Sequence, residues 1–187
     1  MGVQFPSKAF LSHGDHYVLI VLFLHHLCRL ATESATKFRV GEDAMTLEDL
    51  EDKLPNGFHD AEIFSFELDY PAGIATFRMN LLVGWPDDPE PERQAYQKAT
   101  LVVTGLCFCS IDAPSSTYPF LPDGKPICVS GDAAKSDHLP SLSDLLAKLP
   151  SSAWCYRFFV DDWNAFIHVA GRDAELSWVG DKPKHAL

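Results

Sequence analysis

The sequence predicts an α+β fold that is mainly β: an antiparallel sheet of about six strands in hairpins, with one or two short helices packed on it. Segments in which apolar and polar residues alternate recur from residue 45 onward, and this period of two is typical of half-buried strands. Turn sequences, such as Asn-Gly at 56–57 and Tyr-Pro-Ala-Gly at 70–73, separate these segments. Because such turns join antiparallel neighbours, the helical crossovers of a parallel sheet are not expected.

The first elements expected are a short acidic helix and a hairpin. Thr46 is a good N-cap residue for a helix over about 47–53. Strict alternation over 64–70 predicts a strand, and a return strand follows at about 74–84. The buried face of the first strand is expected to carry Phe64, Phe66, Leu68 and Tyr70.

The rest of the chain predicts more strands, two loops and a second helix. Further strands are expected at about 98–111, 126–130, 154–160, 165–170 and 174–179. Gly105 is expected to mark a bulge in the first of these. Proline and acidic residues predict an exposed loop at 85–97, and a long loop is expected at 112–139. A leucine stripe predicts a helix at about 141–149.

Composition and charge exclude several classes of function. The chain has 187 residues, 47% hydrophobic and 12% aromatic, so it can bury a core and is not expected to be disordered. Its formal net charge is −11, and residues 1–44 hold four basic and four acidic side chains, so residues 45–187 carry all of this charge. Such a domain repels phosphate backbones, which argues against nucleic-acid binding, and attracts a protein partner with a basic surface. Solubility alone is the simpler explanation.

An N-terminal extension, residues 1–44, differs from the single β-rich domain expected at 45–187. Its apolar run at 17–24 is about half the roughly 20 residues of a membrane-spanning helix, so a membrane role is not expected. Three interpretations stay open: a targeting signal, an apolar helix over 17–31 packed on the domain or on a partner, and a segment that is not native to the protein. The third is favoured, because the charge balance changes here and Met45 starts a good helix sequence.

The cysteines show no disulfide pattern, since their number is odd and their spacing irregular. They are Cys28, Cys107, Cys109, Cys128 and Cys155. Reduced thiols fit a cytoplasmic protein best. Cys107 and Cys109 are half a zinc site, which Cys128, Cys155 and His168 would have to complete. Their shared strand face is typical of a core, where free cysteine is ordinary, so no metal or cofactor is expected.

His59 and Asp60 form the first candidate site. They follow the Asn-Gly turn, where a side chain can reach a cleft, and a histidine beside an acid can act as a general base or a metal ligand. The favoured interpretation is structural, with Asp60 capping backbone N–H groups and His59 bonded to a carbonyl. Neighbours in a strand point to opposite faces, so the two side chains are not expected to act together.

The acidic turn Asp161-Asp162-Trp163-Asn164 is the second candidate. Closely spaced acids can hold a hard cation, but this spacing matches no calcium loop, and Asp and Asn are ordinary turn residues. Trp163 at the tip of a turn indicates a contact surface if it is exposed. His168 is a further candidate, although a histidine in a strand is more often a satisfied core or cross-strand residue.

Phe58-His59-Asp60-Ala61-Glu62, followed by the alternating strand to Tyr70, resembles a segment of small β-rich bacterial proteins. The immunity-protein-50 family of polymorphic-toxin immunity proteins is the nearest that can be named. The resemblance covers about 54–111 and 153–179, where the later segments 162–167 and 175–178 are similar to the closing strands of such proteins. It implies a non-enzymatic binding module that neutralises a partner, and it assigns no catalytic role.

The leading hypothesis is therefore a cytoplasmic binding protein of the immunity type, which holds a protein partner. Its expected contact residues are Trp85, Asp87, Asp88 and Trp163. The alternative is a small metal-dependent hydrolase that uses His59, Asp60, Asp161 and Asp162, which requires these side chains to converge around a cleft. A structural or oligomerising protein would instead expose a large apolar patch.

Overall fold

The computed structural model describes residues 44–117, 125–133 and 143–183. Contacts within the chain divide it into two units, Met1–Arg39 and Val40–Leu187, and the described residues all belong to the second. The apolar helix expected at 17–31 lies outside the described residues, and so does the start of the helix expected at 141–149.

The predicted mainly β, antiparallel fold is confirmed. The described residues form one sheet of eight strands, all paired antiparallel. The strands are β1 (Ala61–Asp69), β2 (Ile74–Leu82), β3 (Tyr96–Thr104), β4 (Phe108–Ile111), β5 (Ile127–Ala133), β6 (Trp154–Val160), β7 (Ala165–Gly171) and β8 (Asp173–Trp178). The short helices are α2 (Leu47–Glu51) and α3 (Ser143–Leu146), with single 3-10 turns η1 (Glu92–Gln94) and η3 (Asp161–Trp163). No helix among these described residues is long and apolar enough to cross a membrane.

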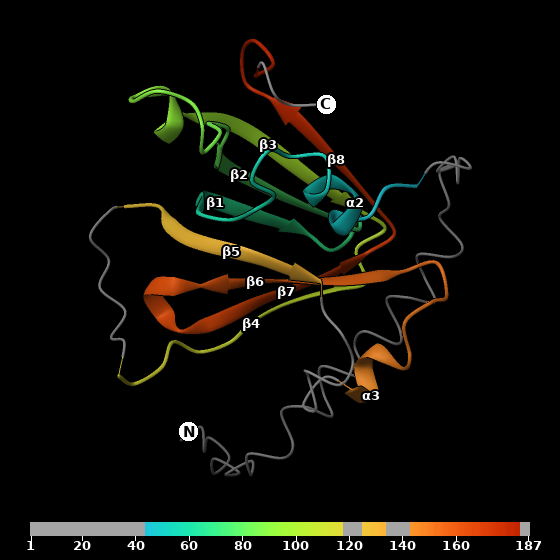
Figure 1. The fold of residues 1–187 in the computed structure, drawn as a ribbon. Coiled ribbons are helices and arrows are strands. Elements are labelled where there is room, and N and C mark those ends of the chain that lie inside the picture. Colours follow the sequence, from blue (N-terminus) through green and yellow to red (C-terminus); the bar gives the residue numbers. More distant parts are fainter. Residues whose placement is uncertain (1–43, 118–124, 134–142, 184–187) are drawn as a thin grey trace, which may run out of the picture. The chain divides into compact units, whose positions relative to one another are not determined.

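The two ends of the sheet are linked through the chain, because β3 leads directly into β4 and β7 leads directly into β8. The order of the sheet is β4-β7-β6-β5-β1-β2-β3-β8, with β4 and β8 at the two ends. In the chain, however, β4 follows β3 after residues 105–107, and β8 follows β7 after Arg172. Strand β3 pairs with β8, and β4 pairs with β7. These four strands therefore form one long two-stranded ribbon, which bends between its β3-β8 part and its β4-β7 part. Two layers result, with β1, β2, β3 and β8 in one and β5, β6, β7 and β4 in the other (Figure 1).

The core lies between these layers and is rich in aromatic side chains. Phe158 of β6 is central to it. Its ring centroid lies 5.5 Å from that of Phe58, 5.9 Å from that of Phe77 and 5.2 Å from that of Tyr156. All four side chains are almost fully buried, and burying a ring of this size stabilises the fold by about 1.5–3 kcal/mol. The aromatic alternation that predicted β2 and β6 thus points into one shared core.

Helix α2 is an integral part of the domain. Thr46 Oγ1 accepts a hydrogen bond from the Asp49 N–H (3.0 Å), and Asp49 Oδ2 accepts one from the Thr46 N–H (2.8 Å), which makes a capping box. Leu47 and Leu50 are buried in the core. The Met45 carbonyl accepts a hydrogen bond from the N–H of Ala174 in β8 (2.8 Å). Residues from Met45 onward therefore belong to the packed unit.

Strand β1 contains a bulge that overturns part of the predicted buried face. Ile63 pairs with Met79 and Ser65 with Arg78, which leaves Phe64 without a partner. The extra residue reverses the alternation. As a result, the Phe64 side chain is 48% exposed on the outer side of the sheet. Phe66 and Leu68 do pack against the core as predicted, whereas Tyr70 is exposed at the end of the strand.

Gly105 divides the strand expected at 98–111 into β3 and β4. Its φ of +59° is a left-handed conformation that glycine adopts without strain. The chain turns here, and Arg172, at the corresponding point between β7 and β8, donates its backbone N–H to the Thr104 carbonyl (3.0 Å). The predicted bulge is therefore the corner at which the sheet bends from one layer to the other.

Candidate functional site

The outer side of β1, β2 and β3 carries charged and apolar side chains in contact with solvent, and we call it the open face. Residues that pair directly across antiparallel strands lie on the same face. Two adjacent rows of outward residues are Glu62, Asn80 and Lys98, and Ser65, Arg78 and Thr100. The large apolar side chains exposed beside these rows are Phe64 (48%), Tyr96 (42%) and Val179 (55%).

His59 and Asp60 lie at the edge of the open face and their side chains are in contact, with His59 Nδ1 2.8 Å from Asp60 Oδ2. The expectation that their side chains point apart was wrong, because Asp60 is not extended: its φ is +55°. Phe58 and Ala61 on either side are fully buried and anchor this turn. Both members of the pair therefore project into solvent, with His59 71% exposed.

Asp161 and Asp162 follow the end of β6, and the strand order brings this end to the same edge of the sheet as Asp60, which precedes β1. Strand β5 lies between β1 and β6, with Val129 paired to Ala61 on one side and Val160 on the other. Cys128, the residue before Val129, is where these acids meet. Its pKa is raised to about 11, first by burial, then by the charge and hydrogen bond of Asp161, and further by Asp60 and Asp162.

Glu62 completes a cluster of carboxylates at this edge. The pKa of Tyr96 is raised first by burial and then by the charges of Asp60, Glu62 and Cys128. Glu62 Oε2 accepts a hydrogen bond from Asn80 Nδ2 (2.8 Å). We call Asp60, Glu62, Asp161 and Asp162 the acidic cluster.

The geometry of the acidic cluster does not make a metal site. Within the described residues, no group of three or more His, Cys, Asp or Glu side chains is arranged to hold a metal ion. The proposed thiol ligands are not gathered either. Cys109 packs against the core, and burial raises its pKa to about 11, which disfavours the thiolate that zinc requires.

The two other residues of the acidic turn have structural roles. Trp163 is half-buried and packs against the core, and its role as a contact residue stays a prediction. Asn164 has a φ of +45°, and its N–H donates to the Asp161 carbonyl (3.3 Å). It ends η3 in the left-handed conformation that asparagine tolerates well, as expected for a turn residue.

Trp85, predicted as a contact residue, is 46% exposed in the loop after β2. Its N–H donates to Asp88 Oδ2 (2.8 Å), and the Asp88 N–H donates to the Trp85 carbonyl (3.0 Å). Asn56 Nδ2 also donates to the Gly84 carbonyl (2.8 Å), which ties this loop to the turn before β1. Asp88 therefore shapes the loop, whereas the Asp87 side chain is exposed.

His168 lies on the outer side of the other layer and is only 2% exposed. It pairs with Ser110 of β4, stacks on Phe166 at 5.7 Å between ring centroids, and has Nε2 3.5 Å from Asp112 Oδ2. Burial lowers the pKa of His168, Asp112 opposes this, and Arg157 lowers it further. His168 Nδ1 has no hydrogen-bond partner within the described part of the chain. His168 is therefore closed off from solvent in this structure.

We call the outer side of β4, β6 and β7 the covered face. Phe108 and Ala170 are directly paired, like Ser110 and His168, so they share this face. Phe108 is 4% exposed and Ala170 fully buried, although neither belongs to the core cluster between the layers.

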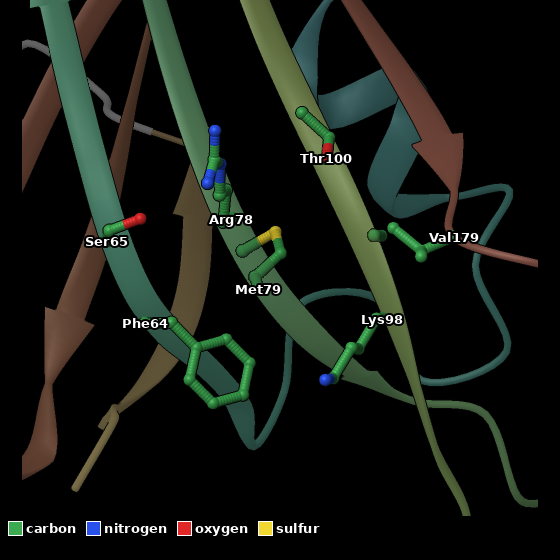
Figure 2. A pocket seen from close by; sticks show the side chains of 8 residues that line it. Phe64, Ser65, Arg78, Met79, Lys98, Thr100 and Val179 are labelled. Carbon is green, nitrogen blue, oxygen red and sulfur yellow. The ribbon is translucent and has the colours of Figure 1, made fainter.

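A groove on the open face was missed by the sequence analysis. It is lined by Phe64, Ser65, Arg78, Met79, Lys98, Ala99, Thr100 and Val179, and its volume is about 300 Å³ (Figure 2). Arg78 and Lys98 occupy polar positions of two alternating strands, which the sequence does reveal. Their proximity depends on the register between β2 and β3. The loop between these strands sets the register, and the sequence did not predict the path of that loop.

Comparison with other proteins gives no family for this chain. No protein-family model matches it, and no curated protein or solved structure gives a match. The resemblance to immunity proteins therefore stays a prediction. Inference about function starts from the open face and the acidic cluster.

Proposed function

We propose that this protein is a non-enzymatic binding module that engages a protein partner through its open face and acidic cluster. The observation that carries the proposal is the juxtaposition of exposed aromatic rings with converging carboxylates. Phe64 and Tyr96 are nearly half exposed, and the charges of Asp60 and Glu62 act on Tyr96, whose pKa they raise. Aromatic anchors surrounded by polar groups are typical of protein-binding surfaces.

The charges at this edge favour a partner with a basic surface. Asp161 and Asp162 come from a segment far from Asp60 in the sequence, yet all three act on Cys128. Apart from the contact of His59 with Asp60, no lysine, arginine or histidine side chain lies within ion-pair distance of the acidic cluster among the described residues. These carboxylates would attract a partner with a basic surface and speed its association.

We propose further that the protein is of the immunity type and that it is cytoplasmic. An inhibitor that neutralises a basic protein benefits from an acidic, preformed contact surface. Free thiols suit a reducing compartment, and Cys109, Cys128 and Cys155 are free.

Affinity capture with the full chain as bait tests the proposal. Wild-type bait is compared with Asp161→Lys/Asp162→Lys and with the control Asp144→Lys/Asp181→Lys, which changes the net charge equally at exposed sites elsewhere. The expected result is one stoichiometric, basic protein that the wild type and the control retain and the cluster variant loses. Equal retention by all three baits, or no stoichiometric partner, contradicts the proposal.

A metal-dependent hydrolase is the alternative, and it would need His59, Asp60, Asp161 and Asp162 to move closer together around an ion, since they are not arranged to hold one in the described structure. Titration calorimetry with MnCl2 separates the two functions. Stoichiometric binding of Mn²⁺ to the wild type that is lost in Asp161→Asn would favour the hydrolase. The binding module predicts no saturable heat.

A further inference from the structure

The groove on the open face runs across three strands. Phe64 and Ser65 contribute from β1, Arg78 from β2, Lys98 and Thr100 from β3, and Val179 closes the far side after β8 (Figure 2). Met79 and Ala99 also line the groove, although both are buried. The bulge in β1 creates one wall, because it turns the Phe64 ring outward from the core.

Arg78 and Lys98 give this groove a charge opposite to that of the chain. Both side chains are exposed, and neither forms an ion pair or hydrogen bond with any other described residue. Two cations without acidic partners are notable in a protein whose net charge is −11. A guanidinium can bind a carboxylate through two parallel hydrogen bonds, and an ammonium adds a second point charge.

Apolar walls restrict the ligand further. Phe64 and Val179 are each about half exposed and lie at opposite ends of the groove (Figure 2). A small inorganic anion would neutralise the cations but leave these side chains in water. A ligand with a carboxylate beside an apolar group would satisfy both.

We infer that this groove binds an acidic segment of a protein partner in which aspartate or glutamate stands next to a leucine- or phenylalanine-sized side chain. The inference rests on the proposed function, since the groove lies on the open face. The acidic cluster and the groove then make this face bipolar, and a bipolar face fixes the orientation of a partner better than a single charge does. A second copy of the chain is disfavoured, because two molecules of charge −11 repel each other.

Fluorescence anisotropy with labelled peptides tests the inference on the full chain. The probe is fluorescein-Gly-Glu-Leu-Glu-Leu-Gly, compared with Gly-Lys-Leu-Lys-Leu-Gly and Gly-Glu-Ser-Glu-Ser-Gly. Saturable binding is expected for the first peptide and much weaker binding for the Ser peptide. Arg78→Glu/Lys98→Glu should weaken binding of the first peptide about tenfold or more, as expected when charge-assisted hydrogen bonds are lost.

The control variant is Lys148→Glu/Arg172→Glu, which changes the net charge equally at exposed positions outside the groove. It should bind the first peptide as the wild type does. Peptide-induced shifts of the Ser65 and Thr100 amide resonances in a ¹⁵N-labelled full chain should locate the site. Equal binding of the Ser peptide, preference for the Lys peptide, equal loss in the control, or self-association without peptide binding would each overturn the inference.

The experiments distinguish a groove that binds no acidic peptide from a protein that has no basic partner. The Asp161→Lys/Asp162→Lys variant should keep its affinity for the Glu-Leu peptide. A captured basic partner that ignores the groove variant would leave the acidic cluster as the contact surface and remove the groove from it.

Discussion

The two outer faces of the sheet have opposite relations to solvent. On the open face, Phe64 is 48% exposed beside Arg78 and Lys98. On the covered face, Phe108 is 4% and His168 2% exposed, although both point away from the core. The sequence reflects this difference: β7 reads Ala-Phe-Ile-His-Val-Ala-Gly, with one polar side chain, whereas β2 alternates apolar residues with Thr76, Arg78 and Asn80.

The difference indicates that the covered face contributes to stability and the open face to binding. On the covered face, an aromatic ring and a histidine held neutral by burial contribute to stability. On the open face, aromatic rings and unpaired charges remain in water, where they add little to folding and are available to a partner. Substitutions should therefore affect unfolding on one face and binding on the other.

The largest effect is expected from two matched phenylalanine substitutions. Phe108→Ala should lower the free energy of unfolding by about 3–5 kcal/mol, because it removes a buried ring and leaves a cavity. Phe64→Ala, also at an outward position, should change it by about 0.5 kcal/mol or less. Urea unfolding of both variants measures the contrast. Similar losses in both would show that the faces do not differ.

His168 should make stability depend on pH. Its pKa is lowered in the folded chain, so protonation favours the unfolded chain. The free energy of unfolding is then highest above about pH 6.5 and falls below it, by at most about 1.4 kcal/mol per pH unit, until the folded pKa is reached. His168→Gln should remove this part of the slope.

Asp112→Asn should extend the same decline to lower pH, because the carboxylate opposes the lowered pKa of His168. Urea unfolding at a series of pH values, from neutral to mildly acidic, measures both variants. An unchanged slope in His168→Gln would mean that the histidine is not held neutral.

Cys128 should report the convergence of the acidic cluster. Asp161→Asn/Asp162→Asn removes charges that raise the Cys128 pKa, so alkylation by iodoacetamide at mildly alkaline pH should be severalfold faster. Cys109 is an internal reference, because burial alone raises its pKa. Peptide mapping by mass spectrometry gives both rates. Parallel changes in the two thiols would argue against a local effect.

The smallest effect on stability is expected on the open face. Arg78→Glu/Lys98→Glu should shift the free energy of unfolding by about 0.5 kcal/mol or less, since exposed charges without partners contribute little to it. Thermal unfolding of this variant is the measurement. A clear loss of stability would mean that the two cations hold the fold together and are not kept for a ligand.

Local patterns predicted most of the fold. The strands around Phe77 and Phe158 follow from alternation, and the hairpin turns follow from proline and glycine. The bulge that exposes Phe64 was not predictable, because it depends on the register with β2. Gly105 was correctly singled out, but its role as a corner depends on pairing with β7 and β8.

The candidate site was predicted residue by residue but not as an assembly. Asp60 and Asp161 were each chosen from local sequence, yet only the β1-β5-β6 order brings them both to Cys128. The pairing of His59 with Asp60 was missed because it needs a positive φ at a residue that is not glycine. The packing of Trp163 against the core was not predictable, since a turn sequence does not show which way its tryptophan points.

Affinity capture from lysate with Phe64→Ser/Tyr96→Ser bait beside wild-type bait tests the binding role of the open face most directly. Both full-length baits must first show the same unfolding midpoint, as expected for exposed residues. The predicted result is a stoichiometric protein partner that the wild type retains and the variant loses. Equal capture by both baits, or no stoichiometric partner for the wild type, would contradict it.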